Sequence, residues 1–370
     1  MRLRRARSLV CYWLGDGFVV ENYATNRSYR MDVTAVALLD ELTDWVGRDD
    51  IGNLLAGHDP ASVAQAVEQL HGCGLIVSDT AAETGTDARI GEAWPQWGPA
   101  ARYLHFATRN TPYVPDSVEV RTGIVGDGEP PALSKSCPGA PRIPLPRRPP
   151  PTAASFFDVL YARRTHRAFT EEPVALVTFA TLLATVFGPV AYLDADAFGT
   201  VMQRTSACGG SRHEIEAYVV ARWVSGVPAG VYHYQHVEHA LEWLGPHDDW
   251  ADLAAMSVDQ SGIGEAPFVV VLTAVLERIQ FKYRDTGAYR VMLLNAGHLG
   301  QTFALVATAL GLGPFQTAAF ADERLERLIG VDGVTETVLY LLSAGHPVRT
   351  AVPGDRRFIP PAALNQVRLT

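Results

Sequence analysis

Residues 267–313 read PFVVVLTAVLERIQFKYRDTGAYRVMLLNAGHLGQTFALVATALGLG and combine a buried strand with a long helix. The run Phe268–Leu276 is apolar but reaches only about half of a membrane span, so we interpret it as a strand inside a protein core. The segment Tyr289–Leu310 is apolar at helical spacing and stops at Gly311, which predicts a helix.

Helices and strands alternate along the rest of the chain after residue 154. The expected helices cover 155–169, 176–188 and 324–329, and the expected strands cover 214–224, 230–235 and 337–345. This order predicts fold class α+β, with a central, mostly antiparallel sheet flanked by helices.

The 370 residues are enough for two domains, and their composition excludes several classes of protein. With 48% hydrophobic and 19% charged residues, the chain is neither disordered nor a coiled coil. A net charge of -9 argues against a general nucleic-acid binder. Four cysteines without a CxxC pair suit a reducing cytosol, so we expect a cytoplasmic protein without a signal peptide, membrane segment or metal site.

Residues 1–80 are predicted to form a small winged-helix-like domain. Alternating residues over 9–32 indicate hairpins, helices are expected over 35–42, 51–56 and 60–70, and LIVSD returns as a strand. The expected third helix, ASVAQAVEQLHG, contains no Arg or Lys, which disfavours binding to DNA. One role that the pattern leaves open is to pack against the main domain or its dimer.

Residues 81–153 are expected to connect this domain to the main domain, residues 154–370. The small polar run 80–88 predicts a linker, and a helix is expected near 91–109. The proline-dense run 138–151 predicts an extended strap without regular structure, lying over the main domain.

The first candidate site contains Arg163, Arg164, Thr165 and Arg167, at the end of an expected helix. Their guanidinium forks and hydroxyl suit a phosphate monoester. A solvated helix C-terminus, whose dipole favours positive charge, explains the same residues.

The second candidate site is the loop RTSACGGSRHEIE at 204–216. Gly209 and Gly210 permit close approach of the backbone to a flat or charged ligand, just before a strand. The loop has neither a GxGxxG nor a P-loop pattern, which excludes a Rossmann or nucleotide-hydrolase site. A tight turn into the strand is the alternative interpretation.

The third candidate site is Lys282 with Tyr283. Only Lys135 and Lys282 are lysines among the 31 basic residues, and lysine, unlike arginine, can lose its proton when buried. Lys282 is therefore a candidate base with a phenol beside it, and a surface pair with Asp285 explains it equally well.

A fourth candidate lies within the long expected helix, where His298 and Gln301 share one face. Side chains in such positions meet a ligand or a partner chain, or are satisfied polar groups of a core or interface.

Eight motifs in this order resemble one known family. They are YLHFATR, PRIPLP, RRTHRAF, SACGGSRHEIE, AGVYHY, KYRDTGAYR, GHLGQT and GLG. The chain from about 100 to 346 is similar to the SagB-type dehydrogenases, flavin enzymes of the nitroreductase superfamily close to the azoline oxidases of microcin and cyanobactin pathways. The pattern from MDVTAVALLDEL to GCGLIV resembles the PqqD-type fold, which recognises leader peptides of ribosomally made peptides.

The resemblance implies a nitroreductase-like FMN domain in a homodimer, with each flavin touched by both chains. It places Lys282 beside the flavin as the base, together with Tyr283, and suggests Arg356 or Arg357 as a further phosphate contact. The residues implied in FMN binding are Arg163, Arg164, Thr165, Arg167, Cys208, Gly209, Gly210, Ser211, Gln301, Gly311 and Gly313.

The chain departs from the family pattern around the glycine loop. Serine is usual where Cys208 stands, and proline is usual where Ala207 and Glu214 stand. Asparagine is common where Thr302 stands. Cys208 is either a harmless isostere or the mark of a different substrate.

By resemblance, the expected function is an FMN-dependent dehydrogenase that oxidises a thiazoline or oxazoline of a modified peptide to the thiazole or oxazole, with dioxygen reoxidising the flavin. A cyclodehydratase is the expected partner, and neither nucleic acid nor membrane is expected. Two alternatives stay open: an NAD(P)H-dependent nitro or quinone reductase, and a degenerate oxidase that serves as a peptide-binding scaffold. The sequence does not decide between a ribosomal and a carrier-bound substrate.

Overall fold

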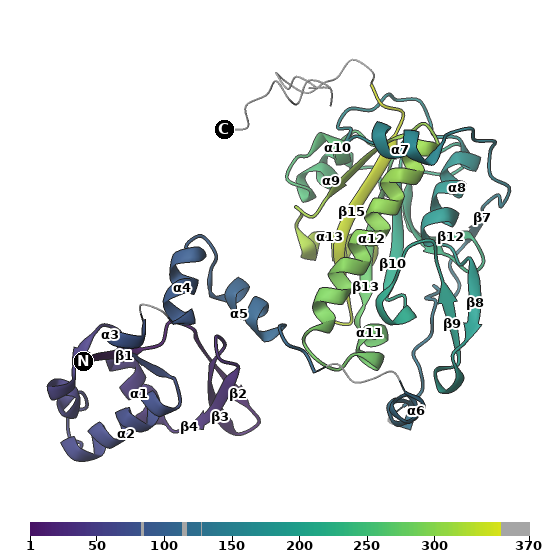
Figure 1. Cartoon of the computed structure of the whole chain (residues 1–370). Coiled ribbons are helices and arrows are strands. Elements are labelled where there is room, and N and C mark those ends of the chain that lie inside the picture. The colour runs from purple at the N-terminus through teal and green to yellow at the C-terminus, as the bar shows by residue number, and fades with distance from the viewer. Residues whose placement is uncertain (83–84, 113–116, 127, 349–370) are drawn as a thin grey trace. The chain divides into compact units, whose positions relative to one another are not determined.

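A computed structural model describes residues 1–82, 85–112, 117–126 and 128–348 (Figure 1). The chain divides into two compact units, Met1–Pro112 and Tyr113–Thr370. Within the described ranges, every helix is too short or too polar to cross a membrane. Arg356 and Arg357, expected near a phosphate, lie outside the described residues.

The first unit contains two small antiparallel sheets and two main helices. The predicted hairpins at 9–32 are confirmed as one three-stranded meander, and the predicted helices and returning strand are confirmed within a few residues. The elements are β1 (Arg2–Arg5), β2 (Leu9–Leu14), β3 (Gly17–Asn22), β4 (Arg27–Met31), α1 (Val33–Glu41), β5 (Val46–Gly47), η1 (Arg48–Asn53), α2 (Pro60–Gly72), β6 (Ile76–Ser78) and α3 (Asp79–Ala82).

Side-chain caps explain where the two main helices begin. The Asp32 carboxylate accepts a hydrogen bond from the Ala35 N–H at 2.8 Å, and the Asp59 carboxylate accepts from the Ser62 N–H at 2.9 Å. Pro60 follows its cap at the first helical position, where a missing N–H costs nothing.

The helix expected near 91–109 is wrong as a single element. The structure has α4 (Thr86–Ala93) and α5 (Pro99–Ala107), separated by a turn. Pro95 and Pro99 lie in and after this turn, and residues before proline disfavour helical backbone, so one continuous helix cannot form. Trp94 packs edge-on against His105, with ring centroids 4.6 Å apart, and joins the two helices.

The second unit is built on a seven-stranded antiparallel sheet in the order β14-β15-β13-β10-β11-β12-β7, which confirms the expected α+β fold (Figure 1). Its strands are β7 (Arg142–Pro144), β10 (Ile215–Ala221), β11 (Gly230–Gln235), β12 (Ala240–Gly245), β13 (Phe268–Val275), β14 (Gly313–Thr317) and β15 (Glu336–Gly345). The hairpin of β8 (Ala191–Asp194) and β9 (Thr200–Gln203) stands apart from this sheet.

Helices cover both faces of the sheet because the central strands are apolar on both sides. Along β13, Val270 and Leu272 belong to the core under α8 and α12, while Val269 and Val271 belong to the opposite core under α9, α10 and α13. The helices are α6 (Val118–Gly126), α7 (Phe156–Ala162), α8 (Leu176–Phe187), α9 (Trp250–Met256), α10 (Ser261–Gly264), α11 (Leu276–Lys282), α12 (Ala288–Ala309) and α13 (Asp322–Ile329).

Two further expectations need correction. The proline-dense run is not wholly irregular, because Arg142–Pro144 forms β7 and pairs with β12 at the edge of the sheet. Proline is tolerated there because one side of an edge strand needs no ladder hydrogen bonds. The helix expected over 155–169 ends at Ala162, so the arginines that follow lie in a loop.

Candidate active site

The glycine loop, residues 208–211, is strained. It connects β9 to β10 and contains a short 3-10 turn, Gly209–Ser211. Gly210 has φ +78°, and the non-glycine residues Ser211 and His213 have φ +54° and +47°. At the two non-glycine residues such backbone costs of order 1–3 kcal/mol per residue and persists only where surrounding contacts enforce it.

Helix α12 and Tyr283 enforce this conformation. The Gly209 N–H donates to Asn295 Oδ1 at 2.9 Å, and a Cβ at Gly209 would lie 2.4 Å from Val291 Cγ1. A Cβ at Gly210 would lie 2.7 Å from Tyr283 Cε2. The structure therefore brings the glycine loop together with Tyr283, and both glycines are required by close approach.

Lys282 is the last residue of α11, the short helix that follows strand β13. Its ammonium lies 5.5 Å from the ring centroid of Phe198 and 5.8 Å from that of Tyr283. Phe198 in turn packs edge-on against Phe281 at 5.9 Å. The lysine head is thus partly buried among aromatic rings, in the same part of the unit as the glycine loop.

The arginine loop, residues 163–167, lies against the start of β14. The His166 N–H donates to the Pro314 carbonyl at 2.9 Å, and a Cβ at Gly313 would lie 2.6 Å from His166 Cγ. Arg167 lies 5.5 Å from the Phe315 ring centroid. Gly311, with φ +78°, makes the turn between α12 and this strand. The loop and the Gly311–Gly313 turn are therefore neighbours.

One chain does not bring the arginine loop and the glycine loop into one pocket. Figure 1 shows α7 beside one end of α12 and α11 at the other. The glycine loop contacts Asn295, whereas the turn at Gly311 follows Ala309, and a helix rises about 21 Å between these two helix residues. Gln301 is exposed on the helix between them.

The donor set fits the phosphorylated flavin that the resemblance implies. Within the described part of the chain, Arg163 and Arg167 make no ion pair with a carboxylate, so their charge is available to an anion. Arg164 Nη1 donates to the Tyr161 and Arg163 carbonyls at 2.7 Å each, which fixes the loop.

Burial governs the ionisable groups around the glycine loop. Burial, with a contribution from Glu214, raises the pKa of Cys208 to about 12, so this thiol stays protonated and is not a nucleophile. Burial likewise raises the pKa of Glu214. Burial and the charge of Arg204 lower the pKa of His213 to about 3. His213 Nε2 lies 2.6 Å from the Met202 carbonyl, which a neutral ring can satisfy.

Asn295 contacts the glycine loop but was not predicted from the sequence. It is buried, at 3% exposure, and lies three residues before His298. His298 Nδ1 lies 3.0 Å from the Ala207 carbonyl, so both side chains contact the same loop. Their i, i+3 spacing was the available signal.

A buried ionic cluster anchors the strap to the sheet. His233 lies between Glu242 at 2.9 Å and Glu216 at 3.2 Å, and Arg278 pairs with Glu216 at 2.6 Å. The Cys137 N–H donates to Glu242 at 2.9 Å. Burial alone would lower the pKa of His233, but hydrogen bonds to Cys137 and Glu216 raise it to about 10. A charged His233 satisfies both carboxylates.

Comparison with known proteins assigns the second unit to a family. The family model described as the nitroreductase family matches residues 160–346, which is half of the chain. The chain belongs to the nitroreductase family. A solved structure of a protein named as a nitroreductase from Anabaena variabilis shares the fold, with a TM-score of 0.51 and 22% identity over 68% of this chain and 48% of that chain.

Three curated proteins are similar in sequence. A protein of Methanocaldococcus jannaschii named as a nitroreductase is 30% identical over 52% of this chain and 90% of its own length. The trifolitoxin operon protein TfxC of Rhizobium leguminosarum is 27% identical over 78% of this chain and 82% of its own length. The microcin B17-processing protein McbC of Escherichia coli is 28% identical over 35% of this chain and half of its own length.

Proposed function

We propose that this protein is an FMN-dependent dehydrogenase of the SagB type, which oxidises a thiazoline or oxazoline of a peptide to the thiazole or oxazole. The observation that carries the proposal is the packing of Tyr283 against the strained glycine loop, with Lys282 in the same cluster. The arginine loop supplies a phosphate-binding set. Two of the similar proteins are named for toxin or microcin production, which supports a peptide substrate.

The residues have separate roles in the proposed reaction. The arginine loop, which includes Thr165, would hold the phosphate, and the loop of Cys208, Gly209, Gly210 and Ser211 would hold the flavin ring. Lys282 removes the proton from the substrate carbon alpha to the ring imine, while a hydride leaves the neighbouring ring carbon, so a carbon–carbon double bond forms. Bound FMN would supply the two-electron redox chemistry that this oxidation requires, with dioxygen as the final acceptor.

The separation of the two loops supports a homodimer in which each flavin meets residues of both chains. The exposed face of α12 presents Leu293 and Leu294, 45% and 62% exposed, and α7 presents Phe156 and Tyr161, 67% and 77% exposed. Apolar surface of this kind is typical of an interface. Gln301 would then complete the site from that face.

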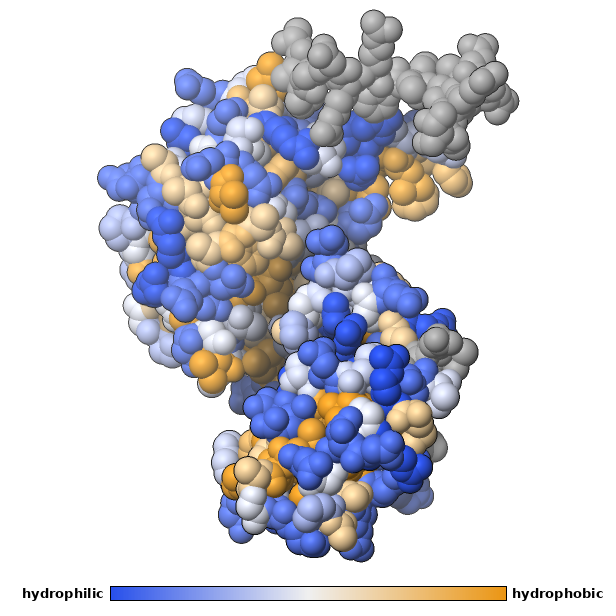
Figure 2. All heavy atoms as spheres, turned by 90° about the vertical axis from the view of Figure 1, so that its left-hand side faces the viewer, coloured by the Kyte–Doolittle hydropathy of each residue, from blue (hydrophilic) through white to orange (hydrophobic). Residues whose placement is uncertain are grey.

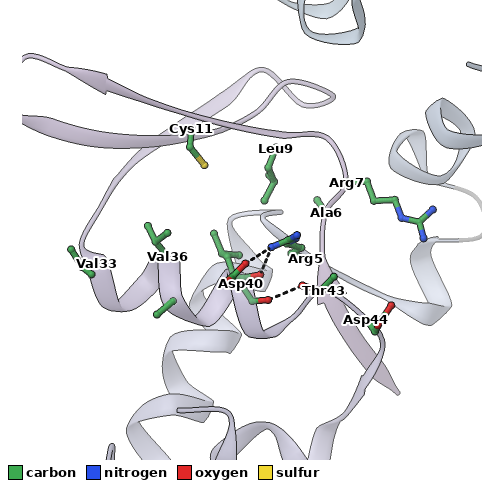
Figure 3. Close-up of a pocket in the computed structure, with 12 residues that line it drawn as sticks. Arg5, Ala6, Arg7, Leu9, Cys11, Val33, Val36, Asp40, Thr43 and Asp44 are labelled. Atoms are coloured by element: carbon green, nitrogen blue, oxygen red, sulfur yellow. Dashed lines mark hydrogen bonds and ion pairs between the residues drawn. The ribbon is translucent and has the colours of Figure 1, made fainter. Parts of the chain in front are cut away.

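The first unit is proposed to bind another part of the peptide. A groove of about 790 Å³ lies between β2 and α1 (Figure 3). Leu9, Val33 and Val36 line it with apolar side chains, and Arg5 pairs with Asp40 at 3.1 Å beside them. Figure 2 shows apolar patches among mostly hydrophilic residues on one face of the molecule. A groove lined by both apolar and charged side chains suits an extended peptide segment.

Two measurements test the proposed function. The purified protein is expected to carry flavin absorbance, and colourless protein that takes up no added FMN would contradict the proposal. K282A is expected to keep FMN but lose turnover. K282R is the matched control, because it keeps the positive charge but cannot act as a base. Turnover by both variants at the wild-type rate would remove the base assignment.

The similarity to the Methanocaldococcus protein favours one alternative, a nitro or quinone reductase that uses NAD(P)H. Rapid bleaching of the flavin by NAD(P)H in the absence of peptide would support that alternative. Bleaching only by an azoline peptide would support the dehydrogenase.

A further inference from the structure

Asn295 links the glycine loop to a buried carboxyl group. Its Oδ1 accepts from the Gly209 N–H at 2.9 Å, and its Nδ2 donates to Glu214 Oε1 at 2.8 Å. Glu214 is fully buried, at 0% exposure, just before β10. Cys208 Sγ lies 3.7 Å from Glu214 Oε2 and 3.5 Å from Asn295 Nδ2. These contacts form a continuous series of hydrogen bonds from the Glu214 carboxyl group, through the Asn295 amide, to the backbone of the glycine loop.

The carboxyl group determines which way the Asn295 amide faces. The two ends of an amide have the same size but opposite hydrogen-bonding roles. Glu214 Oε1 requires a donor, so Nδ2 faces Glu214 and Oδ1 is left to face the Gly209 N–H. A reversed amide would place its NH₂ group against the N–H of Gly209.

Water has little room to replace these contacts. The free space lined by Cys208, Asn295 and Arg204 is about 10 Å³, which is at the lower limit for one water molecule. Removing the carboxyl group would therefore leave the amide without a fixed orientation. Ser211, in the loop that it holds, has φ +54°, which relaxes unless contacts maintain it.

We propose that Glu214 is a positioning residue of the flavin site: acting through Asn295, it holds the Gly209 N–H and the strained loop in the conformation that binds FMN. The inference rests on the proposed function. Proline is usual at position 214 in the family that the chain resembles, and serine is usual at 208. The chain holds its loop through the hydrogen-bonded pair of Glu214 and Asn295.

The test compares FMN affinity with folding in E214A, N295A and the double variant. E214A and N295A are each expected to raise the dissociation constant for FMN at least tenfold, and the double variant is expected to add little, because both residues act through one contact chain. E214Q keeps a carbonyl oxygen for Asn295 Nδ2 and is expected to stay within threefold of the wild type. E326Q, which alters a buried carboxyl group on α13, is the matched control.

The unfolding temperature of the FMN-free protein distinguishes a positioning role of Glu214 from a general effect on the stability of the fold. A purely structural role would lower this temperature without changing the affinity of the folded protein for FMN. Should E214A not fold, E214L removes the acceptor at similar volume and takes its place. If the alanine or leucine variant binds FMN within threefold of the wild-type affinity, the inference about Glu214 is wrong but the proposed function stands. If the wild-type protein itself does not bind FMN, the proposed function is wrong as well.

Discussion

At the scale of single residues, the most demanding position is Gly210. Its φ of +78° disfavours any residue with a Cβ, and that Cβ would lie 2.7 Å from Tyr283. Two independent restrictions therefore meet at one position, the left-handed backbone and the phenol ring packed against it.

Gly210→Ala is expected to destabilise the protein by about 1–3 kcal/mol and to weaken FMN binding, because Tyr283 has to move away from the loop. Urea unfolding and FMN titration measure the two effects. Gly72→Ala is the control, because Gly72 ends α2 in open space without positive φ. Equal stability of the two variants would contradict the tight packing of Tyr283.

His213 predicts a loss of stability on acidification. Its folded pKa of about 3 lies below the usual value of 6.5, because burial disfavours the charged ring. The unfolded chain therefore binds the extra proton first, and stability falls as pH drops below 6.5, by about 2 kcal/mol at pH 5. His213→Gln should flatten this dependence in urea titrations at several pH values.

At the scale of elements, the sequence predicted a helix or a strand correctly where a local hydrophobic pattern alone determines it. The strand Phe268–Val275 and the helix Ala288–Ala309 were both expected, because each is long and strongly apolar. The strand β7 was missed because it depends on pairing with β12 at a sheet edge, which no local pattern encodes. Asn295 was missed because its importance comes from Gly209, a distant residue in the sequence.

The exposed face of helix α12 leads to a prediction about the proposed homodimer. Gly297 lies on its exposed face with nothing within 4 Å of a Cβ, although glycine in a helix costs about 1 kcal/mol relative to alanine. A second helix approaching this face would explain the glycine. Gly297→Trp is expected to convert the proposed dimer to a monomer and to reduce FMN binding, as measured by sedimentation and titration.

The control for this prediction is Val334→Trp, which alters another exposed apolar residue outside α12. It should leave both the mass in solution and the FMN content unchanged. A dimeric Gly297→Trp protein would place the interface elsewhere.

At the scale of the whole molecule, the chain consists of two compact units. The family match covers residues 160–346, whereas the similarity to the trifolitoxin operon protein covers 78% of the chain and so extends beyond the family domain. The proposed division of labour follows: the second unit performs the oxidation, and the first unit holds the peptide.

This division predicts separable kinetic effects. Val36→Asp places a charge among the apolar side chains of the groove between β2 and α1, so it should weaken the binding of a long peptide substrate. We expect KM for that peptide to rise at least tenfold with kcat nearly unchanged, because the flavin site is intact. A short azoline substrate lacking the remote segment should be oxidised equally well by the variant and the wild type. The exposed substitution Asp49→Asn, on η1 outside the groove, is the control. Equal KM values of variant and wild type for the long peptide would show that the groove does not bind it, and the first unit would then have only a packing role.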